Sequence, residues 1–130
     1  MPASTISGDV RGAIKTALAS LNANIYDHVP EAPIVPAIVI VPDSPYAELE
    51  SIGKANVRVK LNYVITCCVA YLSNPASLDN LEKLVMATLG ALSASKYELS
   101  TVERPTITQV GNTNLLVSDI RLSVRYEQTN

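Results

Sequence analysis

The residues whose chemistry suits a nucleophile, a base or a metal ligand are few and scattered along the chain. The single histidine, His28, follows Asp27 and precedes Glu31 by three residues. A zinc site needs three or four convergent ligands, so this small group is better interpreted as part of a solvated loop. Glu48 and Glu50 could act as a pair of catalytic carboxylates, but their polar surroundings favour a solvent-exposed loop instead.

The two cysteines, Cys67 and Cys68, are adjacent and lie in the middle of a long apolar run. Neighbouring residues of a strand point to opposite faces, so a disulfide between them would require a distorted backbone. A nucleophilic thiol needs a base within reach and an electropositive setting, and valines surround these two. We expect reduced thiols that pack in the interior of a cytosolic product.

The sequence also offers little for binding phosphate or nucleic acid. Its five glycines are scattered, and its 10 Lys and Arg residues are dispersed among 12 acids, giving a net charge of −2. Tyr63, Tyr71 and Tyr126 could stack on bases, but they share the phase of the apolar residues, which favours a core or an interface. The sequence therefore predicts no catalytic site, no metal, no cofactor and no specific nucleic-acid binding.

The elements that hold these residues fit one domain, residues 1–130, because this length is typical of a single domain. Apolar residues at helical spacing predict an amphipathic helix from Ser7 to Leu21. A second helix is predicted from Asn74-Pro75, an N-cap followed by proline, through about Ala94. No signal peptide and no membrane span are expected.

Four strands are predicted, over residues 37–41, 57–72, 106–110 and 116–127, from alternating or β-branched apolar residues. Residues 43–56, DSPYAELESIGKAN, are expected to form a long, exposed polar loop. The order α-β-β-α-β-β predicts an α+β fold. In it, two helices pack on one face of an antiparallel or mixed sheet of about four strands.

The predicted strand VRVKLNYVITCCVAYL, residues 57–72, is unusually long. Alternate residues from Val57 to Tyr71 are apolar, while the opposite face begins with Arg58 and Lys60 and becomes apolar or small from Val64 onward. At about 3.3 Å per residue the strand would extend roughly 50 Å. This apolar area exceeds what one small helix-covered sheet can bury. We therefore expect an oligomer joined through strand edges or extensions, with a bent monomeric sheet as the alternative.

The order of these features resembles the small tail terminator and tail-completion proteins of long-tailed bacteriophages. The resemblance covers residues 6–127 and is one of pattern, because none of its motifs is catalytic. It rests on NIYDHVPEAP after the first helix, VPAIVIVPDSPY, the long strand VRVKLNYVITCCVAY, the helix NPASLDNLEKLVMATLGAL, and the closing hairpin of TITQVG and LLVSDIRLSVRYE.

This resemblance implies a ring of sister copies, usually a hexamer, at the head-proximal end of the tail tube, assembled in the cytoplasm of a host bacterium. Such a ring ends polymerisation of the major tail tube protein and presents a surface to the head-closure or connector protein. DNA passes through its lumen without specific binding, which fits the net charge of −2. No membrane is involved.

Candidate interface residues follow from position within this arrangement. The polar loop is expected to contact the tube or a neighbour, and the polar start of the long strand to pair with acids across a subunit boundary. The residues are Asp43, Tyr46, Glu48, Glu50, Arg58 and Lys60. Two alternatives remain: a head-tail connector or head-completion protein of the virion neck, and a small oligomeric binding module with no virion role. An enzyme is disfavoured.

Overall fold

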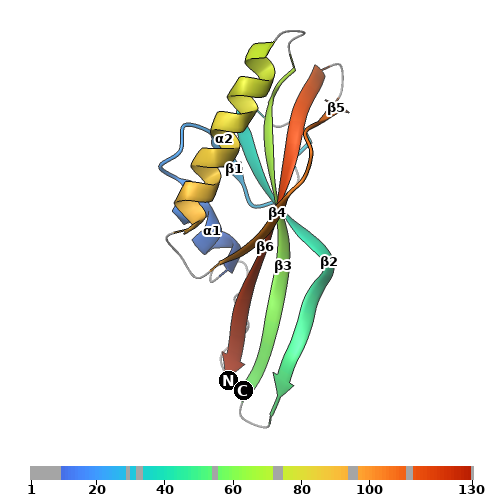
Figure 1. The fold of residues 1–130 in the computed structure, drawn as a ribbon. Coiled ribbons are helices and arrows are strands. Elements are labelled where there is room, and N and C mark those ends of the chain that lie inside the picture. Colours follow the sequence, from blue (N-terminus) through green and yellow to red (C-terminus); the bar gives the residue numbers. More distant parts are fainter. Residues whose placement is uncertain are drawn as a thin grey trace.

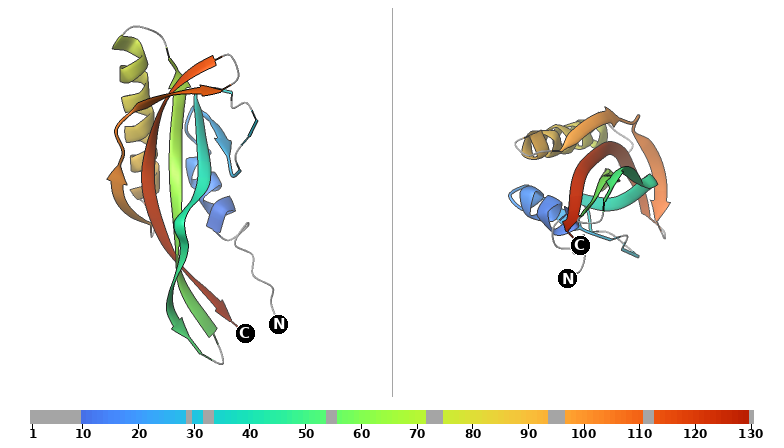
Figure 2. Two further views of the ribbon diagram at one scale, coloured as in Figure 1. Left: turned by 90° about the vertical axis from the view of Figure 1, so that its right-hand side faces the viewer. Right: turned by 90° about the horizontal axis from the view of Figure 1, so that it is seen from below.

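The computed structural model describes residues 10–28, 30–31, 34–53, 56–71, 75–93, 97–110 and 113–129. These residues form a six-stranded mixed sheet with two helices on one side of it (Figures 1 and 2). The elements are, in chain order, α1 (Gly12–Leu18), β1 (Asn24–Tyr26), β2 (Ala37–Ile52), β3 (Asn56–Ala70), α2 (Pro75–Ser93), β4 (Glu98–Val102), β5 (Thr106–Val110) and β6 (Thr113–Thr129).

Three long strands, β2, β3 and β6, form the centre of the sheet. The strand order is β1-β2-β3-β6-β4, and β5 also pairs with β6. Only β1 and β2 are parallel, while the other neighbouring strands are antiparallel. Because β5 pairs with residues 113–117 of β6 and β4 with residues 120–123, these two short strands follow one another along the same edge.

The expected fold, with about four strands in the order α-β-β-α-β-β, is wrong. The structure adds β1 and β4 and consists mostly of sheet. Neither strand is evident from the sequence. β1 has only three residues, and β4, ELSTV, has no alternation of apolar and polar residues, in keeping with its exposure at four of five positions. Pairing with longer neighbours therefore creates both strands where their own residues give no alternating apolar pattern.

Residues 43–52, expected as most of an exposed loop, continue β2 instead. Ala47 and Leu49 lie opposite Leu61 and Val59 of β3, so pairing with the long strand overrides the polar composition of the segment. The ladder shifts register between Pro42 and Ala47 and again between Leu49 and Ser51. Extra residues at such bulges accommodate a proline that a regular ladder would exclude.

The core lies between the sheet and the helices. The predicted apolar face of the long strand is confirmed, since Leu61, Tyr63, Ile65 and Cys67 of β3 are all buried. The second predicted helix is also confirmed, as α2 covers β3 and β6. The buried apolar residues of the helices are Ile14 and Leu18 of α1 and Leu81, Val85 and Leu92 of α2.

Within the described residues the first helix, α1, spans Gly12–Leu18 and ends three residues before the predicted end at Leu21. Ser7, the predicted start of that helix, lies outside the described residues. No helix within the described ranges is both long enough and apolar enough to cross a membrane.

Candidate interaction surface

The most distinctive feature of the molecule is a three-stranded ribbon that extends past the helices (Figures 1 and 2). It comprises residues 47–52 of β2, 56–61 of β3 and 124–129 of β6, and we call it the arm. Leu49 lies opposite Val59, which in turn lies opposite Tyr126. Directly opposed residues of antiparallel strands share a face, so the register gives the arm two chemically different faces.

The apolar face of the arm continues the core face of the sheet toward solvent. Leu49 is 67% exposed. Val57, Val59, Val124 and Tyr126 are half-buried. Exposed apolar side chains clustered on one face commonly mark a site of association. This face of the arm is therefore a candidate contact surface.

The opposite face of the arm is charged and is held together by ion pairs. Arg58 of β3 pairs with Glu127 of β6 at 2.7 Å. Arg125 of β6 bridges Glu50 of β2 at 3.2 Å and Glu98 of β4 at 2.7 Å. These pairs link four strands, so they fix the arrangement of the charged face even though each exposed pair contributes little stability alone.

Glu98 pairs with two bases of this network, Lys60 and Arg125. Lys60 approaches it at 3.3 Å from β3, while Arg125 reaches it from β6. The hydrogen bond and charge of Lys60, with the charge of Arg125 adding to them, lower the pKa of the Glu98 carboxyl. The hydrogen bond and charge of Glu50 raise the pKa of Arg125. Both shifts favour the charged forms of Glu98 and Arg125.

A second ion-pair centre lies where the arm joins the rest of the sheet. Arg121 of β6 contacts Asp43 of β2 at 2.9 Å and Glu103 of the β4–β5 connection at 3.0 Å. Glu103 and Asp43 both raise the pKa of the Arg121 guanidinium, Glu103 through the larger contribution. Arg121 thus connects the bulge of β2 to the opposite edge of the sheet.

The bulge of β2 is fixed on both faces of the sheet. The hydroxyl groups of Tyr46 and the buried Tyr63 lie 3.0 Å apart on the core side. On the charged side, the amide of Asn62 donates hydrogen bonds to the carbonyl oxygen of Pro45 at 2.9 Å and to Oε2 of Glu48 at 3.0 Å. These contacts hold the bulge in place at the base of the arm.

The structure brings all six predicted interface residues together on β2 and β3. Glu48, Glu50, Arg58 and Lys60 lie on the charged face of the arm. Asp43 lies on the same side of the sheet at the base of the arm, and Tyr46 lies there on the core side. Each of the six contacts a partner within its own chain. They therefore shape the surface, and their contact with other subunits stays a prediction.

Sequence reasoning missed several residues of this surface. Arg121, Arg125 and Glu127 were recognisable as the polar side of an alternating strand, but nothing in the sequence indicated which acids they would meet. Glu98 and Leu49 were missed because their strand segments were not predicted.

The residues suited to catalysis do not converge. His28 Nδ1 lies 3.0 Å from the carboxylate of Asp27, and both groups are in contact with solvent. No group of three or more His, Cys, Asp or Glu residues in the described part of the chain could hold a metal ion. Cys67 and Cys68 are free and buried, and burial raises the pKa of their thiols to about 12 and about 11. Both thiols are therefore protonated and unreactive at neutral pH.

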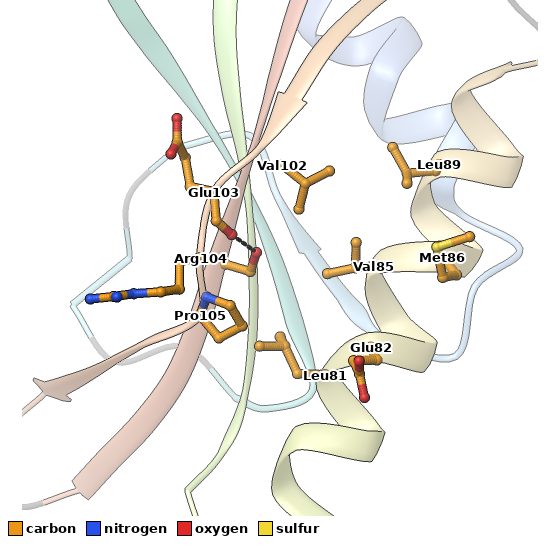
Figure 3. A pocket seen from close by; sticks show the side chains of 10 residues that line it. Leu81, Glu82, Val85, Met86, Leu89, Val102, Glu103, Arg104 and Pro105 are labelled. Atoms are coloured by element: carbon orange, nitrogen blue, oxygen red, sulfur yellow. Dashed lines mark hydrogen bonds between the residues drawn. The ribbon is translucent and has the colours of Figure 1, made fainter.

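A shallow groove of about 350 Å³ lies between α2 and the β4–β5 connection (Figure 3). Leu81 and Val85 point from α2 toward this connection, whereas Glu103 and Arg104 point away from the helix. The groove is therefore apolar and brings no reactive groups together. Its lining is Leu81, Glu82, Val85, Met86, Leu89, Val102, Glu103, Arg104, Pro105 and Ser118.

Comparison with known proteins gives a likeness of fold. No protein-family model matches the chain, and no curated protein matches its sequence. The solved structure of the virion of a native gene transfer agent (GTA) particle contains a chain that resembles this one with a TM-score of 0.55 and 16% sequence identity. The match covers 95% of this chain and 100% of that chain. The protein therefore shares the fold of a whole chain of that virion.

Proposed function

We propose that the protein is a structural component of a phage-like virion and acts by assembly rather than by catalysis. The observation that carries this proposal is the fold shared with a chain of the GTA virion, which extends over 95% of this protein. A component of a particle works through contacts with its neighbours. The arm, with one charged and one apolar face, supplies a surface of the required kind.

Within the virion, the role that we assign is that of the tail terminator at the head-proximal end of the tail tube. The order of sequence features supports this role, because it resembles that of tail terminator proteins over residues 6–127. Sister copies would close into a ring, six by that resemblance. One face of the ring fits the tube end, while the other lacks the surface that recruits further tube protein. Tube growth then stops, and the second face is left for the head-closure protein.

The apolar face of the arm supports assembly on energetic grounds. Leu49 is 67% exposed, and half-buried valines of β3 and β6 lie beside it. Burial of apolar surface contributes roughly 25 cal/mol per Å², so a neighbour that covered this face would gain a favourable contribution to its free energy of association. The tube end or an adjacent subunit would provide that cover.

The charged face suits a channel through which DNA must slide. Acids outnumber bases on it, and the bases are already engaged by acids of the same chain. Tight phosphate binding requires free basic groups that displace counterions, and such groups are missing from the described part of this face. Counted with the ion-pair partners beside the arm and at its base, the acids are Asp43, Glu48, Glu50, Glu98, Glu103 and Glu127, and the bases are Arg58, Lys60, Arg121 and Arg125.

A tube-capping assay tests the proposed function. Polymerising major tail tube protein of the same virion would be mixed with the full chain, and tube lengths and tube ends would be recorded by electron microscopy. We expect shorter tubes with a ring at one end. Unchanged tube lengths with bare ends would contradict the terminator role. Binding to isolated head connectors without binding to tubes would instead assign the protein to the neck.

A further inference from the structure

Both edges of the arm are open in the part of the chain that the structure describes. β1 pairs with β2 only at Ala37–Val39, so the outer edge of residues 47–52 has no strand beside it. β4 pairs with β6 only as far as Ser123, so the outer edge of residues 124–129 is open as well. An open edge presents backbone N–H and C=O groups that can pair with another strand.

The two open edges have matching length and direction. Each spans six residues, and both strands are antiparallel to β3, so β2 and β6 run the same way. Neither AELESI (47–52) nor VRYEQT (124–129) contains proline, whereas Pro42 and Pro45 confine the interruption of β2 to its bulge. Rotation about an axis roughly parallel to the arm would place β2 of one copy beside β6 of the next, in parallel.

The edges also carry opposite charges at one position of the same face. On the β2 edge of the arm, Glu48 and Glu50 are both acidic. On the β6 edge, Arg125 remains 63% exposed at its side chain despite its ion pairs, and Glu127 is engaged by Arg58. Opposite charges on facing strands favour pairing, whereas like charges oppose it. The β2 edge is therefore complementary to the β6 edge at Glu48 and Arg125, with Glu127 neutralised by Arg58, whereas two β2 edges would bring only acids together.

We propose that the arms of sister copies pair edge to edge, with residues 47–52 of one copy parallel to residues 124–129 of the next and Glu48 beside Arg125 of that neighbour. This inference rests on the proposed ring and specifies the contact that closes it. Because the two surfaces of each contact differ, the association is head-to-tail, and a rotation that closes gives a ring rather than a pair.

Disulfide cross-linking tests this contact directly. Within one chain, Glu48 lies opposite Lys60 and Lys60 lies opposite Arg125, so residues 48 and 125 are two strands apart. Two strand spacings amount to about 9.6 Å, beyond the span of about 7 Å that a disulfide can bridge. A Glu48→Cys/Arg125→Cys chain can therefore form this disulfide only between copies, because Cys67 and Cys68 are buried.

We expect this double variant, oxidised under conditions in which the wild-type chain forms rings, to give a ladder of covalent multimers on non-reducing gels. Glu48→Cys alone and Arg125→Cys alone are the matched controls and should give no ladder, because each would find no cysteine opposite. Wild-type rings together with an uncross-linked double variant of native circular dichroism would overturn the edge pairing and leave the proposed function standing. Failure of the wild-type chain to form rings, even on tube ends, would overturn both.

A charge-exchange experiment covers the case in which the cysteine variants do not fold. Glu48→Arg and Arg125→Glu would each place like charges at residues 48 and 125 of every contact, and we expect about a tenfold or greater loss of ring formation from each. An equimolar mixture should recover rings of alternating copies. Mixing cannot restore the hydrogen bond from Asn62 to residue 48 in one chain or the ion pairs of residue 125 in the other, so recovery would demonstrate a contact between copies. A mixture that stays dissociated would contradict the proposed pairing.

Discussion

The hydroxyl groups of Tyr46 and Tyr63 lie 3.0 Å apart, and their rings meet edge to face at 89° with centroids 5.7 Å apart. Tyr63 is fully buried in β3, whereas Tyr46 in the bulge of β2 is 39% exposed. Burial and this hydrogen bond raise the pKa of Tyr63 above its ordinary value of 10.0. The pair fixes the bulge at the base of the arm and forms the boundary between core and arm.

Because Tyr63 is buried and Tyr46 is partly exposed, removing the hydroxyl group from each should lower the free energy of unfolding by different amounts. Tyr46→Phe should lower the free energy of unfolding by about 1–3 kcal/mol, because it leaves the buried Tyr63 hydroxyl without its partner. Tyr63→Phe should cost less than about 1 kcal/mol, because the Tyr46 hydroxyl can reach water. Urea unfolding of both variants checks this order, and equal losses would contradict the assigned hydrogen bond.

The buried cysteines should resist alkylation. Because burial raises the pKa of Cys67 to about 12 and of Cys68 to about 11, the thiolate is scarce at pH 8 in the folded chain. We expect iodoacetamide to modify neither residue in native buffer and both in urea, as followed by mass spectrometry. Rapid modification of the native protein would show that the face of β3 that carries the modified cysteine opens to solvent.

The ion pairs of Glu98 predict a dependence of stability on pH. Lys60 and Arg125 lower its pKa from the ordinary value of 4.5, so the stabilisation is complete above that value and is lost as the pH falls through the lower folded value. Glu98→Gln should therefore melt at a lower temperature than the wild-type chain at pH 7, and the two melting temperatures should converge once the pH falls below the lowered pKa of Glu98. A difference that persisted in acid would indicate a packing effect instead.

Gly90 lies in the interior of α2, and a Cβ added there would meet nothing within 4 Å. No close approach by another element therefore explains the glycine. Gly90→Ala should raise the free energy of unfolding by about 0.5–1 kcal/mol, since alanine favours the helix. Thermal and urea unfolding measure this gain, and a loss of stability would show that this part of α2 is not a regular helix.

The sequence predicted those elements whose own residues carry the pattern. The face of β3 from Leu61 to Cys67 and the helix α2 follow from apolar spacing, and both are found where expected. β4 and the outer half of β2 form because longer strands lie beside them, and ELSTV offers no local sign of this pairing. Cooperation between strands, rather than local preference, decides such segments.

The candidate surface shows the same limit. Alternation identified Arg58 and Lys60 as polar residues of a strand, but their partners Glu127 and Glu98 lie 69 and 38 residues away in the chain. Which charges meet depends on strand order and register, and these follow from the whole sheet. The missed second half of β2 hid Leu49, and with it the apolar face of the arm.

The central claim is that the apolar face and open strand edges of the arm on one copy are covered by neighbouring copies. A measurement of the native mass tests this claim most directly, first for the full chain alone and then for the full chain bound to tail tube ends. We predict a closed oligomer for the wild-type chain. Its formation should fall about tenfold or more with Leu49→Ser on the arm and stay unchanged with the control Ile107→Ser on β5, a similarly exposed strand residue. A wild-type chain that stays a monomer in both settings would contradict the account.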